Sequence, residues 1–254
     1  MLFKPKFVYH KKLESHVWDS NNHMRPAVRD ALLEFINLFF LYVQRLNIPF
    51  DMSGVRDIFI HGSITNYYYN NQSDIDVCVW CDFNNLSKKL SGINIATLLK
   101  NVAKALTVDM EPSICGRKID IVFADPEQLR NVEGIHKGSG NMYSIMNDKW
   151  IRMSPRLNKT TIQSMYAQAT NIAIDMAVHI RHLVKHAQRS DDIVKYINQK
   201  LSIRTNDAIN NYAQPITPMI IAFRMVRNMG LLDLAYERVL KLRVSEQMGE
   251  KNVP

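Results

Sequence analysis

Apolar side chains recur along the chain with two different periods, and each period predicts a different kind of element. Short apolar runs, or alternation of apolar and polar positions, predict β-strands at Val55–His61 and Ile75–Cys81. The segment from Pro26 to Asn47-Ile48-Pro49 instead repeats its large apolar side chains every three to four residues, as one face of an α-helix does. We expect its buried face to consist of Val28, Leu32, Phe35, Phe39, Tyr42, Val43 and Leu46, and its N-cap to lie among Ser20, Asn21 and Asn22.

Further short elements follow before residue 153. Residues 87–106 have helical spacing, and residues 107–113 and 117–124 predict a β-hairpin that turns at Cys115-Gly116. Residues 142–153 predict two short strands around Asn147-Asp148.

Beyond Ser154-Pro155 the pattern is helical throughout. It predicts helices at residues 160–188, 191–201, 206–229 and 233–244. We therefore expect an α+β protein with three parts: a domain at residues 1–153 that contains the strands, an all-helical C-terminal domain at residues 154–245, and a flexible tail at residues 246–254.

Composition narrows the class of protein. The 254 residues are 46% apolar, which is typical of a globular chain, and the formal net charge of +8 favours polyanionic partners such as nucleic acid or nucleotides. A basic surface that is simply solvated is an equal alternative. No signal peptide and no apolar stretch of membrane-spanning length is present, so we expect a soluble, cytoplasmic protein with no membrane partner.

The three cysteines do not predict a disulfide framework. Cys78 and Cys81 have the spacing of a zinc motif, but residues three apart on a strand point to opposite faces. We therefore expect buried free thiols at these positions.

Two carboxylates at the start of the second predicted strand are the main candidates for a functional site. Asp74 and Asp76 are two residues apart, so on a strand they would share a face, where their charges repel unless a divalent cation lies between them. Gly62 and Ser63 follow the first strand. A glycine there lets the backbone approach a ligand, and N–H groups with a hydroxyl can meet a phosphate. Together these residues predict a metal-dependent nucleotide site.

A third carboxylate, Asp120, interrupts an otherwise apolar strand. Burial of a carboxylate without a partner is costly, and a shared metal would provide one. Asp109 and Glu111 remain alternatives, since either could face the same cleft from the neighbouring predicted strand.

The residues His61-Gly62-Ser63 and Ser73-Asp74-Ile75-Asp76-Val77 resemble the nucleotidyltransferase superfamily, which includes DNA polymerase beta, the CCA-adding enzymes and antibiotic nucleotidyltransferases. The family pattern is a strand ending in Gly-Ser, about a dozen residues, then Asp-x-Asp, with a third carboxylate on a later strand. The resemblance covers residues 57–123. It implies a small mixed sheet with flanking helices and assigns the third carboxylate to Asp120.

The resemblance also implies an activity. A nucleotidyltransferase moves a nucleoside monophosphate from an NTP, with ATP the expected one, to an acceptor hydroxyl and releases pyrophosphate. Asp74, Asp76 and Asp120 would be the catalytic carboxylates and would hold Mg²⁺ or Mn²⁺, while Gly62 and Ser63 would bind the nucleotide's phosphates.

The sequence does not identify the acceptor. An RNA or tRNA 3′ end suits a basic protein with a helical second domain. Alternatives are a nucleotide-condensing synthase of cyclic or linear oligonucleotides and an adenylyltransferase of small molecules or proteins. A non-catalytic nucleotide- or RNA-binding protein that keeps the fold is the alternative from another class. The sequence after Gly-Ser, Ile64-Thr65-Asn66-Tyr67, lacks the small or basic residues often found there in template-independent RNA polymerases and cyclic-oligonucleotide synthases.

Two further clusters have a functional and a structural interpretation. Tyr67, Tyr68 and Tyr69 could stack on a base, but we expect at least two of them to pack beneath the loop. On the long C-terminal helix, Asp175, His179, His182 and His186 lie along one flank of the apolar stripe and could hold a metal or contact phosphates. For these four residues we favour a boundary position beside the core with no ligand.

Overall fold

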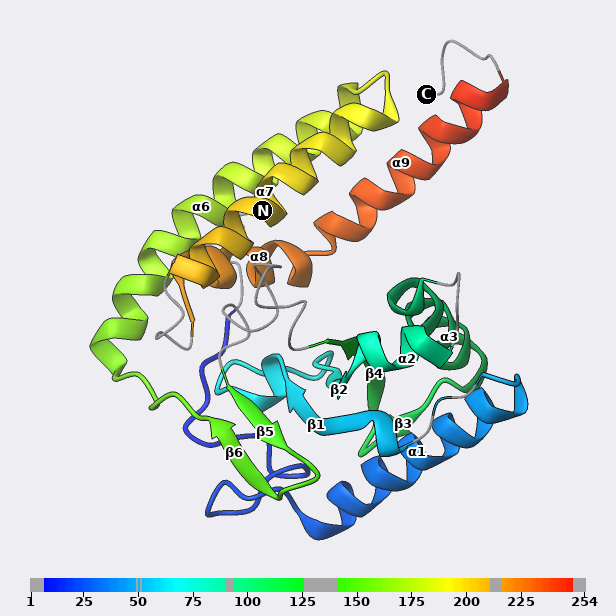
Figure 1. The fold of residues 1–254 in the computed structure, drawn as a ribbon. Coiled ribbons are helices and arrows are strands. Elements are labelled where there is room, and N and C mark those ends of the chain that lie inside the picture. The colour runs from blue at the N-terminus through cyan, green and yellow to red at the C-terminus, as the bar shows by residue number, and fades with distance from the viewer. Residues whose placement is uncertain are drawn as a thin grey trace. The chain divides into compact units, whose positions relative to one another are not determined.

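The computed structural model describes residues 7–48, 50, 52–89, 94–125, 141–210 and 216–248. Contacts within the chain divide it into two compact units, which are visible in Figure 1. We call Val8–Arg156 the sheet unit, and Leu157–Pro254 together with Met1–Phe7 the helical unit. Phe7 belongs to the helical unit, and its ring packs against Tyr166, with 6.5 Å between the ring centroids.

A mixed β-sheet forms the centre of the sheet unit. Its strand order is β3-β4-β2-β1-β5-β6. Strands β2 and β4 run parallel, and every other neighbouring pair in that order is antiparallel. The strands are β1 (Val55–His61), β2 (Ile75–Cys81), β3 (Ser113–Ile114), β4 (Arg117–Ala124), β5 (Met142–Ser144) and β6 (Lys149–Arg152).

One face of this sheet forms the main hydrophobic core with two helices, α1 (Pro26–Arg45) and α3 (Ile95–Met110). A shorter helix, α2 (Phe83–Lys89), follows β2, and the one-turn 3₁₀ helices η1 (Met52–Gly54) and η2 (Ser63–Thr65) lie on either side of β1. Alternation along the strands selects the core residues, since each second side chain points to the same face. On the three central strands these core residues are Ile58, Ile60, Ile75, Val77, Val79, Cys81, Ile119 and Ile121.

The other face of the sheet carries a smaller apolar cluster of Phe59, Cys78, Ala124 and Met142, with Trp80 packed against it. We call this the second face. Cys78 belongs to it, whereas Cys81 belongs to the main core, and both are buried free thiols. The prediction that these two cysteines point to opposite sides of a strand is therefore confirmed.

The helical unit consists of α6 (Lys159–His186), α7 (Ser190–Asn210), α8 (Pro218–Asn228) and α9 (Leu231–Met248). Helix α6 packs against the other three, and its apolar stripe supplies Ala169, Ala173, Met176, Ala177 and Ile180 to the interior. The predicted tail begins inside this unit, because residues 246–248 form the end of α9, while residues 249–254 lie outside the described residues.

Helix α1 was predicted correctly in extent but not in its cap or all of its buried face. Asp19 accepts hydrogen bonds from the backbone N–H groups of Asn21 and His23, so this polar segment forms its own turn and Arg25 is the N-cap. Tyr42 and Leu46 are exposed, and the buried positions include two residues missing from the prediction, Ile36 and Phe40.

The predicted hairpin at residues 107–124 is wrong in its first half. Helix α3 continues to Met110, and the hydroxyl of Thr107 donates to the carbonyl oxygen of Ala103 within it. The helix ends at Glu111, whose φ of 40° is left-handed, so only Ser113–Ile114 remains to pair with β4. The predicted helix at residues 87–106 is likewise two helices, with Asn94 as the side-chain N-cap of the second.

Three predicted helices of the C-terminal part also have different limits. Helix α7 continues through the predicted break after Leu201 and reaches Asn210, and α8 begins only at Pro218. Thr217 caps α8 by accepting a hydrogen bond from Ile220 N–H, and Pro218 fits the first helical turn, where no donor is needed. Helix α9 extends from Leu231 to Met248, beyond both predicted ends.

These elements make the protein α+β, with a mixed sheet followed by C-terminal helices, as the sequence predicts. The two strands expected around Asn147-Asp148 are β5 and β6. Within the described residues, none of the helices combines the length and apolar character needed to cross a membrane.

Candidate functional site

Gly62 follows β1 directly and has a backbone conformation that suits only glycine. Its φ is 79°, and a Cβ atom placed on it would overlap the carboxylate oxygen Oδ2 of Asp76. The Asp76 side chain therefore lies directly against the glycine backbone. A left-handed φ and a side chain pressed onto Cα are two independent reasons for glycine at this position.

The carboxylates of Asp76 and Asp120 come from neighbouring positions in the sheet. Asp76 on β2 pairs in register with Asp120 on the parallel strand β4, and with His61 on the antiparallel strand β1. In both strands the adjacent residues, Ile75 and Ile119, point into the main core, so the two aspartates lie on the second face.

Asp74 precedes β2 and acts electrostatically on Asp120. The pKa of Asp120 is raised, first because surrounding atoms displace part of its hydration and then because of the negative charge of Asp74. Asp120 remains exposed and Asp74 is half-buried, so solvent reaches both carboxyl groups. Asp74, Asp76 and Asp120 thus form one acidic group at this edge of the strands.

These carboxylates do not form a closed metal cage. Within the described part of the chain, no group of three or more His, Cys, Asp or Glu side chains is arranged so that it could hold a metal ion. The alternatives to Asp120 lie elsewhere in the fold. Residue 109 is in the last turn of α3 and its side chain lies outside the described set, and Glu111 is exposed at the C-cap of that helix, so neither is on a neighbouring strand.

Ser63 begins η2 and is buried, with 8% of its surface exposed. Buried polar residues fix this turn. Thr65 Oγ1 and Asn66 Nδ2 both donate to the carbonyl oxygen of Gly62, at 2.9 and 2.6 Å. Asn141 Nδ2 donates to the carbonyl oxygen of Thr65 at 2.7 Å, which ties the turn to the start of β5.

The N-terminal segment holds the same turn from the other side. The indole Nε1 of Trp18 donates to the carbonyl oxygen of Ile64 at 2.9 Å. Trp18 is 1% exposed and stacks on Trp150, with ring centroids 4.6 Å apart. Residues 8–25 have no helical or strand periodicity, and this buried tryptophan gives them a structural role beside the site.

A buried arginine positions the turn that leads into Asp74. Nη1 of Arg117 donates to the carbonyl oxygens of Asn70 and Ser73, each at 2.9 Å. Nη2 of Arg117 lies 3.7 Å from Oε1 of Glu14, and both side chains are more than nine-tenths buried. Arg117 is thus the link between β4, the N-terminal segment and the turn before β2.

His61 adds a neutral imidazole to the second face. Burial lowers the pKa of His61 from 6.5 to about 4, so the ring is uncharged at neutral pH. Its Nε2 atom is hidden from solvent and has no hydrogen-bond partner among the described residues. The sequence left the direction of this side chain open. The structure places it beside Phe59, with ring centroids 6.0 Å apart, and not in the main core.

Arg152 brings a cation to the second face. Its Nη2 atom contacts Sδ of Met142 at 3.7 Å, and Met142 belongs to the apolar cluster with Phe59 and Cys78. Burial lowers the pKa of Arg152, although a guanidinium stays charged at neutral pH. The sequence offered no signal for Arg152, since one arginine on a short strand is ordinary.

The three consecutive tyrosines pack against the protein. Tyr67 and Tyr68 are buried, and Tyr69 stacks on His10 with ring centroids 3.9 Å apart and an interplanar angle of 12°. The expectation that at least two of them pack beneath the loop is confirmed.

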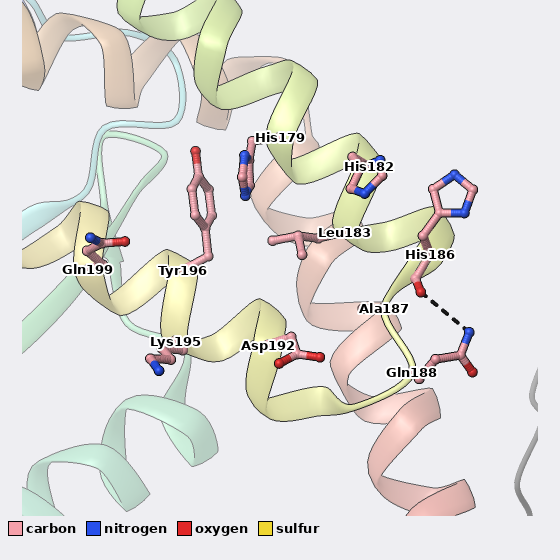
Figure 2. A pocket seen from close by; sticks show the side chains of 10 residues that line it. All are labelled: His179, His182, Leu183, His186, Ala187, Gln188, Asp192, Lys195, Tyr196 and Gln199. Carbon is pink, nitrogen blue, oxygen red and sulfur yellow. Dashed lines mark hydrogen bonds between the residues drawn. The ribbon is translucent and has the colours of Figure 1, made fainter.

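The histidine flank of α6 borders a pocket within the helical unit, shown in Figure 2. The pocket has a volume of about 490 Å³ and lies between α6 and α7. His179, His182 and His186 line it from α6, while Asp192, Tyr196 and Gln199 line it from α7. Asp175 is not among the lining residues, but its charge helps burial to raise the pKa of Tyr196 to about 12.

Several of these contributions were not predicted. Arg117, Trp18 and Asn141 act through contacts between residues 44 to 103 positions apart, and Asn66 acts through a buried amide hydrogen bond. Local sequence periodicity does not predict such contacts. No model of a known protein family, curated protein or solved structure is significantly similar to this chain.

Proposed function

We propose that this protein is a metal-dependent nucleotidyltransferase that uses the second face of its sheet as the active site. The observation that carries the proposal is the register of Asp76 with Asp120 on adjacent parallel strands, next to a glycine backbone that packs directly on Asp76. Asp74 is the third member of the acidic group, and its negative charge contributes to the raised pKa of Asp120.

The donor set fits a hard cation such as Mg²⁺ or Mn²⁺, because carboxylate oxygens are the ligands these ions prefer. Mg²⁺ usually binds proteins through one or two carboxylates and takes its remaining ligands from water and substrate phosphates. Asp76 and Asp120 would hold the ion, with Asp74 alongside, so three simultaneous protein ligands are not required. The bound ion would supply Lewis-acid activation of the phosphoryl group and of the acceptor hydroxyl.

The residues around the carboxylates have separable roles in this proposal. The backbone N–H groups at Gly62 and Ser63 would bind the phosphates of an NTP, with ATP as the expected substrate. Asp120 would accept the proton of the acceptor hydroxyl, because its carboxylate lies beside Asp76 in the sheet and is open to solvent. Arg152 would pair with the negative charge of the departing pyrophosphate.

An RNA 3′ end, tRNA included, is the acceptor that the charge distribution favours. Residues 157–254 contain 13 Lys and Arg against 8 Asp and Glu, whereas residues 8–156 contain 17 against 16. The basic excess therefore belongs mainly to the helical unit, and a polyanionic acceptor is attracted to such a surface.

The test compares two isosteric charge removals. Asp76→Asn should reduce transfer of label from an α-labelled NTP in the presence of Mg²⁺ by about 100-fold or more, because metal activation supplies several kcal/mol of transition-state stabilisation. Asp82→Asn is the matched control, since Asp82 follows β2 immediately, pairs with Arg56 and lies outside the acidic group. It should retain wild-type activity within a few-fold.

The acceptor is identified in the same assay by offering total RNA, small hydroxylated molecules and protein together. Label in RNA supports the proposed acceptor, whereas labelled small products or labelled protein would replace it with nucleotide condensation or adenylylation. Absence of label in every pool while nucleotide binding is intact would overturn the catalytic proposal in favour of a non-catalytic binding protein. Equal activity of Asp76→Asn and Asp82→Asn would overturn the assigned site.

A further inference from the structure

We propose that His182 and His186 on α6 form a binding site for a divalent transition-metal ion such as Zn²⁺. The site lies wholly within the helical unit and is independent of the nucleotidyltransferase proposal. Their ring centroids are 4.8 Å apart with an interplanar angle of 41°, and both side chains are exposed.

The spacing of the two histidines is the basis of the proposal. Residues four apart on an α-helix stand one above the other on the same face. Two imidazoles at this spacing can bind one ion together, as the two histidines of the helical H-E-x-x-H motif do. Because both rings are exposed, they can adjust to an ion without opening a packed core.

The third histidine of the flank is already engaged. His179 stacks on Tyr196 with ring centroids 4.3 Å apart and an interplanar angle of 13°, as Figure 2 shows. The ammonium of Lys200 lies 5.4 Å from the centroid of the same tyrosine ring. Turning His179 toward an ion would break this stack, so we assign it a packing role and limit the site to two protein ligands.

The pocket beside these histidines leaves room for the other ligands that the ion needs. Zn²⁺ takes four ligands, and an open site fills the remaining positions with water or an added ligand. With about 490 Å³, the pocket has room for several waters next to the two imidazoles, and Asp192 lines it from α7. Two protein ligands also agree with the absence of a three-ligand group among the described residues.

Imidazole ligands separate this site chemically from the acidic site of the sheet unit. Imidazole favours Zn²⁺, Ni²⁺ and Cu²⁺, whereas carboxylates favour Mg²⁺ and Mn²⁺. Titration with ZnCl₂ in an excess of Mg²⁺ should therefore fill the histidine site while Mg²⁺ competes for the carboxylates.

Isothermal titration of the complete protein with ZnCl₂ in an excess of Mg²⁺ tests the proposal. We expect one Zn²⁺ per chain. His182→Ala and His186→Ala should each weaken binding by about tenfold or more, because the second tethered imidazole acts at a high effective concentration. His179→Ala is the matched control on the same helix and should change the affinity by less than about twofold, since that ring does not bind the ion. Far-UV circular dichroism checks that each variant keeps its helices.

Two further measurements make the assignment specific. Zn²⁺ should slow amide hydrogen exchange in the last turn of α6 in the wild-type protein and not in His186→Ala, because a bound ion fixes that turn. Asp76→Asn should bind Zn²⁺ as the wild type does. The proposal is overturned if no Zn²⁺ binds, if His179→Ala loses as much affinity as His186→Ala, or if Asp76→Asn abolishes binding.

Discussion

At Gly62, backbone conformation and side-chain packing both exclude any other residue. Comparison with a second glycine, Gly116, separates these two effects. Gly62→Ala would force a Cβ atom into the Asp76 carboxylate as well as straining a φ of 79°. Gly116 has a similar φ of 71°, but nothing lies within 4 Å of the Cβ that alanine would add. Gly116→Ala therefore measures the backbone strain alone.

We expect Gly116→Ala to cost about 1 kcal/mol of unfolding free energy and Gly62→Ala about 2–4 kcal/mol, because the second variant adds displacement of a carboxylate to backbone strain. Urea denaturation gives both values. Gly62→Ala should also abolish the nucleotide transfer proposed above, whereas Gly116→Ala should retain it. Equal losses of stability in the two variants would show that the Asp76 carboxylate moves aside freely.

His61 gives the protein a defined acid sensitivity. Its pKa is 6.5 in an unfolded chain and about 4 in the folded protein, so between these values the unfolded state binds more protons. Stability is complete above pH 6.5 and falls as the pH decreases toward 4, by up to about 3 kcal/mol.

The measurement is the free energy of unfolding from pH 7.5 to pH 4 for wild type and His61→Gln. The difference between the two proteins should shift in favour of the variant as the pH falls, because glutamine does not titrate. His23→Gln, at an exposed histidine, controls for the loss of an imidazole that is not buried. A slope that is unchanged in His61→Gln would mean that this imidazole is not buried as a neutral group.

At the scale of elements, the turn before β2 depends on one buried ion pair. Arg117→Met would remove the guanidinium beside the buried Glu14 carboxylate, which keeps its contacts with His16 and Val17. It would also remove one hydrogen bond from each of the carbonyls of Asn70 and Ser73. We expect a loss of about 3–5 kcal/mol, the usual cost of breaking a buried pair on one side. Arg56→Met breaks the exposed pair with Asp82 and should cost less than about 1 kcal/mol.

The unfolding free energies of the two variants, measured by heat and by denaturant, test this expectation. A further variant separates the charge of Arg117 from the geometry of its guanidinium group. Arg117→Lys keeps the charge but loses the guanidinium fork, so it should recover part of the stability and little of the turn's geometry. Equal stability of Arg117→Met and Arg56→Met would remove Arg117 from this role.

The spacing of apolar residues predicted correctly those elements in which the spacing is uninterrupted. It did not predict helix limits that depend on a single residue. Strands β1 and β2 have the predicted limits, since alternation ends sharply at Gly62 and at Asp82. The start of α8 and the end of α3 depend instead on Thr217 as a cap and on the left-handed conformation of Glu111. An apolar pattern carries no information about such single-residue effects.

At the scale of the whole molecule, the order of the elements along the chain predicted the α+β class but not the contacts that assemble the site. The sequence groups Asp74 with Asp76 because they are two residues apart, and it adds Asp120 because a carboxylate is unusual in an apolar strand. The parallel register that sets Asp120 beside Asp76 is a long-range property. The pocket between α6 and α7 beside His182, and the packing of His179 on Tyr196, also depend on contacts between two helices. Only the folded structure shows such contacts.

The distribution of tryptophan has an optical consequence. All three tryptophans, Trp18, Trp80 and Trp150, belong to the sheet unit, and residues 157–254 contain none. Indole emission excited near the red edge of protein absorption therefore reports on the sheet unit alone, while far-ultraviolet ellipticity reports on the helices of both units. Without any added label, tryptophan fluorescence thus follows unfolding of the sheet unit separately from the loss of helix in the whole chain.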